Sequence, residues 1–257
     1  MSFPATFDTI GQPFIVLPTV DSTNNYAMAQ ARAGFAGHGT TYFALEQTAG
    51  KGQRGKSWVS APGENIMMSL NLSPGTAHIN QAFLFSATIA LGCYDFYKSI
   101  AGDDTSVKWP NDIYWRDRKA GGILIENQLT PPDNSWSSAI AGMGINVNQT
   151  RFDEYQAKAV SLKQITGKEF DVIRLARSLC GFISQRLELF YKNKSDKILS
   201  DYNSALFMLG QKVKLRQGPV TFETIIKGVD SWGWLLTSDN ADRRFAVGEV
   251  EWIIQKE

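Results

Sequence analysis

The segment over residues 50–63 constrains the fold of this sequence more than any other feature. It opens with Gly-Lys-Gly-Gln-Arg-Gly-Lys-Ser-Trp, three glycines interleaved with three cations, and reaches Pro62 and Gly63 four residues later. Glycine lets backbone N–H groups approach a ligand closely, and the interleaved cations concentrate positive charge at the same place. The segment is therefore predicted to form an anion-binding loop.

The same segment satisfies the Gly-x-x-x-x-Gly-Lys-Ser spacing of a nucleotide P-loop, and a predicted strand precedes it. A P-loop also requires a helix that starts at its lysine, because the N–H groups of the helix N-terminus hold the phosphates. Here Pro62 and Gly63 break any helix within two turns of Lys56. The segment is therefore predicted to bind an anion in some way other than as a P-loop.

Length and composition indicate an ordinary globular chain. Its 257 residues are 43% hydrophobic and 20% charged, with a formal net charge of +1, so nothing indicates nucleic-acid binding. No apolar run reaches the ~18 residues of a membrane span and the N-terminus lacks a signal-peptide pattern, so a cytoplasmic protein is expected. Cys93 and Cys180 match no metal spacing and are expected to be buried thiols.

The predicted order of elements indicates an α+β fold with a mixed sheet and helices on a face. Residues 65–72 alternate apolar and other residues as a half-buried strand does, and Lys119 is placed in a turn. From residue 209 the chain becomes rich in short strands, which predicts a main domain over 1–208 and a small β-barrel over 209–257. In the main domain strands are expected at 14–17, 41–46, 65–72, 106–109, 112–115, 122–126 and 137–147, and helices at 21–32 and 80–100, with a further long helix from residue 171 followed by another to about residue 208.

Five motifs, taken in order along the chain, resemble those of biotin protein ligases. The resemblance runs from about residue 11 to the end and includes the Gly-Glu-Val of residues 248–250. It implies a catalytic domain of the class II synthetase-like, biotin-lipoyl ligase type, followed by an SH3-like barrel. The five motifs are Asp-Ser-Thr-Asn at 21–24, Gln-Thr-Ala-Gly-Lys-Gly-Gln-Arg-Gly-Lys-Ser-Trp at 47–58, Lys-Trp-Pro-Asn-Asp at 108–112, Lys-Ala-Gly-Gly-Ile-Leu-Ile-Glu at 119–126 and Gly-Met-Gly-Ile-Asn-Val at 142–147.

The resemblance implies a two-step reaction. Biotin and ATP form biotinyl-5'-adenylate and pyrophosphate, and the biotinyl group then passes to one lysine of a biotin carboxyl carrier protein or domain. Such chemistry implies Mg²⁺ and a protein acceptor, and it needs no nucleophile from the enzyme. The absence of a plausible Ser/His/Asp or Cys/His set from the sequence is therefore expected.

The resemblance also implies a role for individual residues. The implied catalytic cations are Lys119, Arg54 and Lys51, since attack of a carboxylate on a phosphate brings anions together. The loop is expected to close over the adenylate as a lid. Biotin binding is implied for Ser22, Thr23, Asn24, Gln47, Gly50, Lys51, Gly52, Gln53, Lys119, Gly122 and Gly142. Nucleotide binding is implied for Arg54, Lys56, Trp58, Lys108, Asn111, Asp112 and Asn146, with Asp112 also the implied Mg²⁺ ligand.

Each motif also has a purely structural interpretation. Residues 21–24 suit a helix cap, 108–112 a turn between strands, and Lys119 a solvated turn. The glycines of 121–122 and 142–144 suit close packing of strands. The joint occurrence of the motifs in one order favours the ligase interpretation.

Two positions depart from the family pattern. Gln53 stands where the family commonly has an arginine associated with holding the adenylate, and Ile253 aligns with an arginine that reaches nucleotide phosphates. Gln53 keeps hydrogen-bond donors but carries no charge. Looser retention of the adenylate is therefore expected.

Three functions remain open on the sequence alone. The preferred one is a short, non-regulatory biotin protein ligase, and the others are a lipoyl or octanoyl ligase or transferase of the same fold and a non-catalytic small-molecule binding module. About twenty residues precede Asp21, whereas three helices need roughly three dozen, so no DNA-binding domain and no specific DNA partner are expected. The family includes monomers and homodimers, and the sequence does not decide between them.

Overall fold

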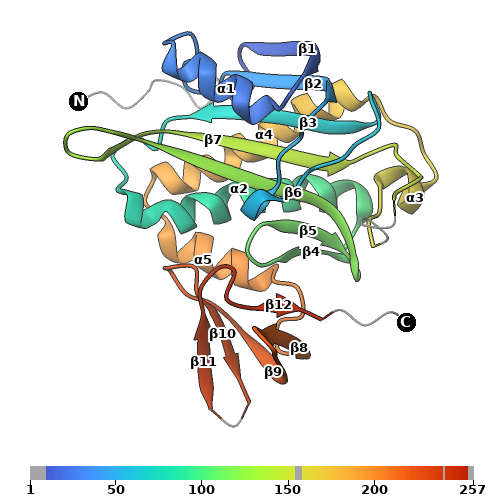
Figure 1. Cartoon of the computed structure of the whole chain (residues 1–257), viewed down its shortest axis with the longest axis vertical. Helices are drawn as coiled ribbons and strands as arrows, with labels where there is room; N and C mark the ends of the chain where they lie inside the picture. Colours follow the sequence, from blue (N-terminus) through green and yellow to red (C-terminus); the bar gives the residue numbers. More distant parts are fainter. Residues whose placement is uncertain (1–9, 154–157, 240, 254–257) are drawn as a thin grey trace.

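The structure is a computed structural model that describes residues 10–153, 158–239 and 241–253. A seven-stranded mixed sheet in the order β1-β2-β3-β7-β6-β5-β4 forms its larger part (Figure 1). Only β1 and β2 pair in parallel in this sheet as described. The strands are β1 (Phe14–Val20), β2 (Thr41–Gln47), β3 (Asn65–Leu72), β4 (Thr105–Lys108), β5 (Asp112–Trp115), β6 (Arg118–Thr130) and β7 (Ser135–Asn146).

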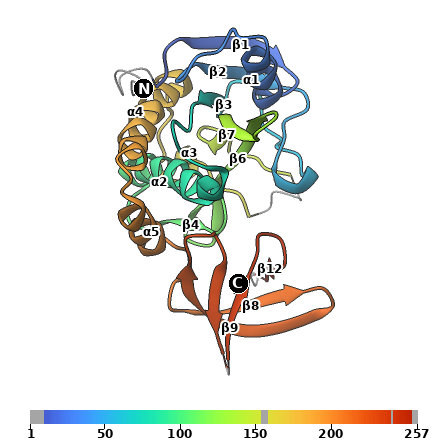
Figure 2. The ribbon, with the colours of Figure 1, turned by 90° about the vertical axis from the view of Figure 1, so that its left-hand side faces the viewer.

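Helices cover one face of this sheet and leave much of the other face to loops. Figure 2 shows α2, α4 and α5 on one side and the segment that follows β2 on the opposite side. The main hydrophobic core lies beneath α2 and α4, and a smaller cluster beneath α1 includes Ala27, Tyr42 and Ile140. The helices are α1 (Thr23–Arg32), α2 (Ala82–Ala101), α3 (Leu162–Thr166), α4 (Val172–Tyr191) and α5 (Ser195–Ser204), with short 3₁₀ turns η2 (Gln53–Gly55) and η3 (Ile79–Gln81).

The burial of β3 differs from its prediction. The bounds Asn65–Leu72 were predicted correctly, but all eight residues are buried, so the prediction of a half-buried strand was wrong. Met68 and Leu70 belong to the main core, whereas Ser69 and Asn65 face the other side and are covered there by polar neighbours. A central strand covered on both faces loses the contrast in exposure on which alternation depends.

Three further local predictions have clear outcomes. Lys119 lies inside β6 and not in a turn, because β6 starts at Arg118 and pairs with β5 through a register shift near Tyr114. The predicted cap at Asp171 is confirmed, since its carboxylate accepts a hydrogen bond from the Arg174 N–H at 3.0 Å. Both cysteines are buried and unbridged, as predicted. No helix in the described ranges is long and apolar enough to cross a membrane.

A second, antiparallel sheet lies at the end of the molecule beyond α5 (Figure 1). Its strand order is β11-β10-β9-β8-β12, and β11 and β12 do not pair with each other within the described residues. The sheet is therefore open as described, and the predicted closed barrel is not confirmed. Its strands are β8 (Lys212–Gln217), β9 (Val220–Val229), β10 (Leu235–Ser238), β11 (Asp242–Phe245) and β12 (Glu251–Trp252).

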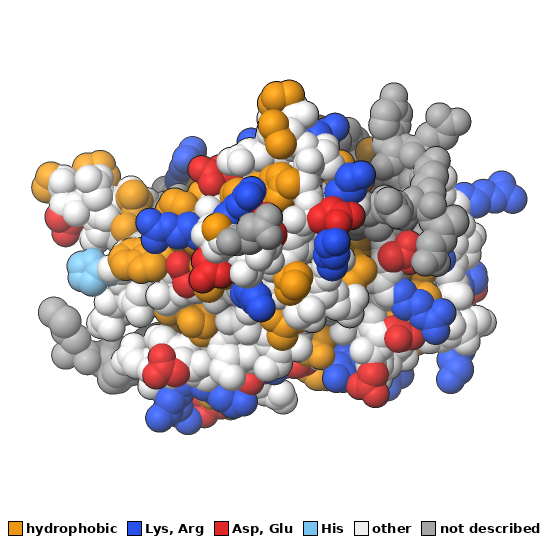
Figure 3. Space-filling model, turned by 90° about the horizontal axis from the view of Figure 1, so that it is seen from below, with side chains coloured by type: hydrophobic (Ala, Val, Ile, Leu, Met, Phe, Trp, Pro, Cys, Tyr) orange, Lys and Arg blue, Asp and Glu red, His pale blue; other side chains and the backbone are white. Residues whose placement is uncertain are grey.

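Hydrogen bonds join this C-terminal sheet to the main sheet. The Trp109 indole donates to the Gly233 carbonyl at 3.0 Å, and Asn203 of α5 donates to the Val229 carbonyl at 2.9 Å. On the face seen from below, cationic and anionic side chains are interspersed (Figure 3). Within the C-terminal sheet, Lys212 Nζ of β8 lies 2.6 Å from Glu223 Oε2 of β9. The predicted boundary between residues 208 and 209 stays a prediction.

Candidate functional site

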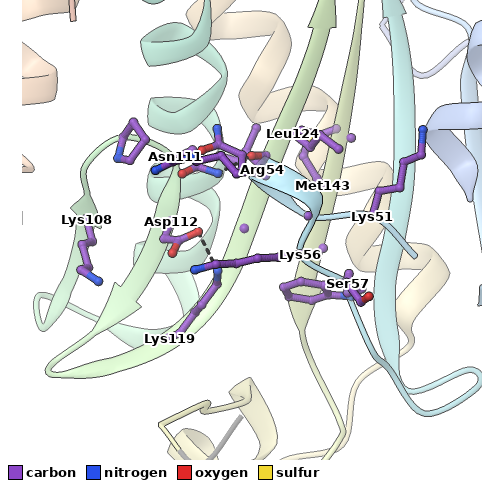
Figure 4. A pocket seen from close by; sticks show the side chains of 18 of the residues that line it. Lys51, Arg54, Lys56, Ser57, Lys108, Asn111, Asp112, Lys119, Leu124 and Met143 are labelled. Carbon is purple, nitrogen blue, oxygen red and sulfur yellow. Dashed lines mark hydrogen bonds and ion pairs between the residues drawn. The ribbon is translucent and has the colours of Figure 1, made fainter. Parts of the chain in front are cut away.

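A cavity of about 590 Å³ lies where the face of the main sheet opposite α2 and α4 meets the C-terminal sheet. It is the place where the predicted motifs converge, although they are far apart in the sequence (Figure 4). The lining comes from the start of α1, the end of β2, the glycine loop, the β4–β5 turn, β6, β7 and the C-terminal segment 247–252.

One wall of the cavity is neutral, polar and buried. Thr23, at the first turn of α1, donates to Gln47 Oε1 twice, from its backbone N at 2.7 Å and from Oγ1 at 3.0 Å. Ser22 precedes it as the helix N-cap residue, but its side chain makes no capping bond. Its hydroxyl is therefore not committed to the helix, and the capping interpretation does not account for this serine.

Asn24 ties the same wall to the main sheet. Its Nδ2 donates to Glu126 Oε2 at 2.7 Å, and Ser69 Oγ lies 2.6 Å from its Oδ1. Gly142 of β7 leaves the room for this side chain, because a Cβ at that position would overlap the Asn24 carboxamide. The glycine in the motif is therefore required by a close approach of a polar side chain.

The centre of the cavity holds a pair of opposite charges. Lys119 Nζ on β6 lies 2.7 Å from Asp112 Oδ1 at the start of β5, and their side chains are 36% and 22% exposed. A Cβ at Gly122 would lie within 3.5 Å of both groups. Lys56 extends from the loop toward the pair, as Figure 4 shows. A mobile anion entering the cavity would thus meet two lysines close to a carboxylate.

Lys108 lies beside this centre in an aromatic setting. Its Nζ lies 3.2 Å from the Tyr114 hydroxyl and 5.7 Å from the centre of the Trp252 ring. Burial lowers the pKa of Lys108 to about 8, against the raising effect of Asp112, and nearby lysines including Lys119 lower it further. An anionic ligand would favour the charged form of Lys108 and offset this effect.

The glycine loop is a short hairpin with a left-handed tip. The Gly52 N–H donates to the Lys56 carbonyl at 2.6 Å, and the Trp58 N–H donates to the Gly50 carbonyl at 2.8 Å. Arg54 at the tip has φ 55°. The chain is extended at Lys56 and no helix starts there, which confirms that the segment is not a P-loop.

The charged ends of two loop cations are engaged outside the centre of the cavity. Lys51 Nζ lies 3.7 Å from Glu126 Oε1 and points to the side opposite Lys119 (Figure 4). Arg54 Nη1 donates to the Gly248 carbonyl of the C-terminal sheet at 2.9 Å. Both residues line the cavity, so their roles as catalytic cations stay predictions.

Most of the predicted site residues line this one cavity, but Gly50 and Asn146 do not. Gly50 is the first residue of the loop, and a Cβ at this position would meet the Trp58 carbonyl and the Gln47 amide. Asn146 is buried and its Nδ2 lies 3.4 Å from the Lys119 carbonyl. Its observed contact is thus with the backbone of the central lysine.

The surroundings of Asp112 bear on the predicted metal site. The described residues contain no group of three or more His, Cys, Asp or Glu side chains that could hold a metal ion. Mg²⁺ is often bound by one or two carboxylates together with substrate phosphates and water. Asp112 and Glu251 are the carboxylates among the described residues that line the cavity, and Asp112, beside Lys119, fits that mode, in which a nucleotide supplies the remaining ligands.

Comparisons with known proteins agree with this geometry. A model of the biotin/lipoate A/B protein ligase family matches residues 16–146. The bifunctional ligase/repressor BirA of Escherichia coli is 32% identical over 245 residues, which cover 93% of this chain and 74% of BirA. This chain belongs to the biotin/lipoate A/B protein ligase family. Biotin--[acetyl-CoA-carboxylase] ligase of Mycobacterium tuberculosis is 26% identical, over 86% of this chain and 81% of that protein.

Solved structures show the same relationship to the ligase family. The biotin protein ligase from Aquifex aeolicus in complex with biotin and ATP superposes with a TM-score of 0.76 and 27% identity. The match covers 94% of this chain and 98% of that one, so it extends over the C-terminal sheet as well as the main sheet. The mixed α+β fold predicted from the sequence is confirmed.

The contribution of the C-terminal sheet to the cavity was not predicted from the sequence. Trp252 and Val247 line it, as does Gly248. The Gly-Glu-Val of residues 248–250 was the only sign of this contribution, and it was used to recognise the family and not to place residues. Ser69 was also missed, although a serine in the apolar run of β3 marks a polar contact.

Proposed function

We propose that this chain is an ATP-dependent biotin protein ligase that forms biotinyl-5'-adenylate and transfers the biotinyl group to a lysine of a biotin carboxyl carrier protein or domain. One observation carries the proposal: a neutral hydrogen-bonding wall and a cationic centre share one cavity in a chain of this family. Relatives named biotin--[acetyl-CoA-carboxylase] ligase and the Aquifex aeolicus ligase in complex with biotin and ATP support it.

The neutral wall suits the ureido end of biotin. A ureido ring carries two N–H donors and one carbonyl acceptor, which match amide and hydroxyl groups. Ser22, Thr23 and Gln47 present such groups on a buried surface. Because they are held by the first turn of α1 and the end of β2, little ordering is needed when biotin binds.

The cationic centre suits adenylation. The biotin carboxylate must approach the α-phosphate, and both are anions, so the site has to neutralise charge and fix the reactants in line. Lys119 is the group we assign to the carboxylate and to the acyl phosphate that forms. Lys56 and Lys108 are assigned to the nucleotide phosphates, since both line the cavity and Lys108 lies within electrostatic range of Lys56 and Lys119.

A nucleotide-bound Mg²⁺ would neutralise phosphate charge as a Lewis acid when present. We assign Asp112 as its protein ligand. Lys119 already occupies one carboxylate oxygen at 2.7 Å, so Asp112 has its second oxygen available for a cation. Asn111, whose Nδ2 donates to the Ile123 carbonyl at 2.5 Å, fixes the turn that presents Asp112.

The second step requires the acceptor lysine to arrive neutral and water to stay away. The adenylate is a mixed anhydride, which water hydrolyses, so closure of the glycine loop over it protects the intermediate. The amine of the acceptor then attacks the acyl carbon and AMP leaves. The enzyme forms no covalent intermediate of its own in this scheme. We place the reaction in the cytoplasm, where ATP and the carrier are available.

Pyrophosphate exchange tests the proposal directly. Incubation with ATP, Mg²⁺ and labelled pyrophosphate should give labelled ATP only when biotin is added, and labelled biotin should then appear on the lysine of a carrier domain. Exchange with lipoate or octanoate in place of biotin would establish the alternative ligase of the same fold. Binding of biotin without any exchange would establish a non-catalytic binding module.

A further inference from the structure

The side chain of Arg54, at the tip of the glycine loop, is bonded to the C-terminal sheet and not to the main sheet in the part of the chain that the structure describes. Its Nη1 donates to the Gly248 carbonyl at 2.9 Å. Gly248 lies between β11 and β12, beside Val247 and Val250, which also line the cavity. The loop that covers one side of the cavity is thus bonded directly to the segment that forms another side.

Gly248 is the residue type that this contact requires. Its φ is 90°, a conformation that residues with a side chain rarely adopt. A Cβ at this position would also overlap the Arg54 guanidinium, because the three nearest heavy atoms are all guanidinium atoms. Backbone conformation and available space therefore both exclude a side chain here.

The loop tip depends on this contact for its attachment. Within the described residues, the other hydrogen bonds of the tip over 52–56 join its own residues, such as Gly52 to Lys56. Arg54 itself has a left-handed φ of 55°, which is uncommon for a residue with a side chain and persists only where the surroundings hold it. The hydrogen bond that Arg54 donates to the Gly248 carbonyl stabilises this conformation.

Charge on the C-terminal sheet favours the same arrangement. The pKa of Glu251 is lowered chiefly by its hydrogen bond to Arg216, and the charges of Lys56 and Arg54 lower it further. Both loop cations therefore lie within electrostatic range of β12. Attraction to this carboxylate draws the loop toward the C-terminal sheet.

We infer that Gly248 is a positioning residue that acts through Arg54 to hold the glycine loop against the C-terminal sheet, so that the two sheets close the cavity together. The inference deepens the proposed function, because a loop held in this way would retain an adenylate. The contact itself is a property of the folded chain and does not depend on which acid is activated. The test therefore begins with a measurement that needs no substrate.

Amide hydrogen exchange, measured on the whole 257-residue chain, reports how firmly the loop tip is attached to the C-terminal sheet. The Gly52 and Lys56 amides report on the tip, and the Ile226 amide, bonded to the Gln211 carbonyl at 3.1 Å, reports on the C-terminal sheet. In Gly248→Ala the tip amides should exchange about tenfold faster, as expected for loss of a hydrogen bond to a charged group. Exchange at Ile226 should stay as in the wild type.

Two further variants separate the contact from a general effect on the sheet. Gly218→Ala is the matched control, because Gly218 lies in the β8–β9 turn of the same sheet with φ 55° but has open space around it. In this variant the amides of the loop tip should exchange as in the wild type. Arg54→Ala should speed tip exchange as much as Gly248→Ala does. The double variant should add nothing to either, because both changes remove the same contact.

Several results would overturn the inference. Tip exchange within twofold of the wild type in Arg54→Ala would do so, and this variant decides the matter if Gly248→Ala unfolds the sheet. Additive effects in the double variant would also do so. If tip exchange responds as expected but no biotin-dependent exchange of pyrophosphate occurs, the positioning role stands and the proposed function fails. If tip exchange responds as expected and biotin-dependent exchange of pyrophosphate also occurs, the variants should release the adenylate about tenfold faster, at an unchanged KM for biotin.

Discussion

The two sides of the cavity are built in opposite ways. Ser22, Thr23 and Asn24 are buried and uncharged, with relative exposures of 2% to 4%, and Thr23 and Asn24 are hydrogen-bonded to side chains of the main sheet. The loop opposite them is cationic, and the Lys51 side chain is 42% exposed. The neutral wall is thus part of the folded core, whereas the cationic side is made of long side chains that are partly exposed to solvent.

This difference has an energetic consequence. Polar groups buried in the wall must all be paired, so a change there disturbs folding and binding together. Surface cations contribute little to stability, so a change there alters chemistry while the fold stays intact. The two sides should therefore respond differently to substitution.

The largest effect is expected from Lys119→Ala at the cationic centre. Biotin-dependent pyrophosphate exchange should fall about 10²- to 10³-fold, as for removal of a preorganised charge at a reacting oxygen. The free energy of unfolding, measured with urea, should change by about 1 kcal/mol or less, because the pair with Asp112 is partly exposed.

Lys163→Ala provides a matched control for this experiment. Lys163 is also 36% exposed and lies 3.0 Å from the carboxylate of Glu169, but it does not line the cavity. Its exchange rate should equal that of the wild type. Equal rates in the Lys119 and Lys163 variants would remove Lys119 from the mechanism and contradict the assignment of the two sides.

Gly142→Ala tests the neutral wall. The added Cβ would overlap the Asn24 carboxamide, so the wall has to shift. Overpacking of this kind costs roughly 1–3 kcal/mol of stability, and the KM for biotin should rise about tenfold. Gly181→Ala in the middle of α4 has open space around it and should stabilise the chain by up to about 1 kcal/mol. An unchanged KM in Gly142→Ala would show that the wall does not bind biotin.

Much of the fold could be predicted because strong periodicity and turn residues specify strands locally. The bounds of β3 and β5 were predicted correctly for this reason. The burial of Ser69 could not be predicted, since it depends on Thr23 and Asn24, which lie some 45 residues earlier in the chain. Lys119 was placed in a turn because Arg-Asp-Arg-Lys has turn composition, and a register shift in the β5–β6 pair was not foreseen.

Site residues that belong to contiguous motifs could be predicted from the sequence. Site residues that a distant part of the chain contributes to the cavity could not. Lys56, Asp112 and Lys119 belong to motifs and line the cavity. Trp252 and Val247 have no local pattern that points to a ligand, because their position depends on how the C-terminal sheet packs against the β4–β5 turn. Long-range packing of this kind is absent from any short window of sequence.

Lys108 offers a test of the cationic side by pH. Its pKa is lowered from 10.5 to about 8 by burial, so the unfolded chain binds more protons between these values. Stability of the wild type relative to Lys108→Met should therefore rise with pH across this interval. We expect Lys108→Met to be more stable by roughly 1–2 kcal/mol at pH 7, less than the full shift implies because the cavity admits water, and to lose much of this advantage by pH 9.5.

Urea denaturation at pH 7 and 9.5 measures this difference, below the ordinary pKa of tyrosine at about 10. Lys98→Met is the control. The hydrogen bond that Lys98 donates to the Asp103 carboxylate raises the pKa of Lys98, so the wild type should gain no stability over this variant as the pH rises through the same interval. A parallel response of the two variants would mean that the cavity does not lower the pKa of Lys108.

The smallest expected effect concerns Gln53, in the glycine loop. Gln53 lines the main cavity and also a neighbouring cavity of about 200 Å³, so its side chain lies at the edge of the covered volume. A charge-assisted hydrogen bond is about twice as strong as a neutral one, so Gln53→Arg should slow adenylate release by about fivefold to tenfold. Gln53→Met, of similar length but without donors, should release it faster than the wild type. Gel filtration of the enzyme with labelled adenylate ranks the three. If the wild type retains the adenylate as well as Gln53→Arg does, then Lys51 or Arg54 already supplies the charge that Gln53 lacks. The loop would then hold the adenylate without an arginine at position 53.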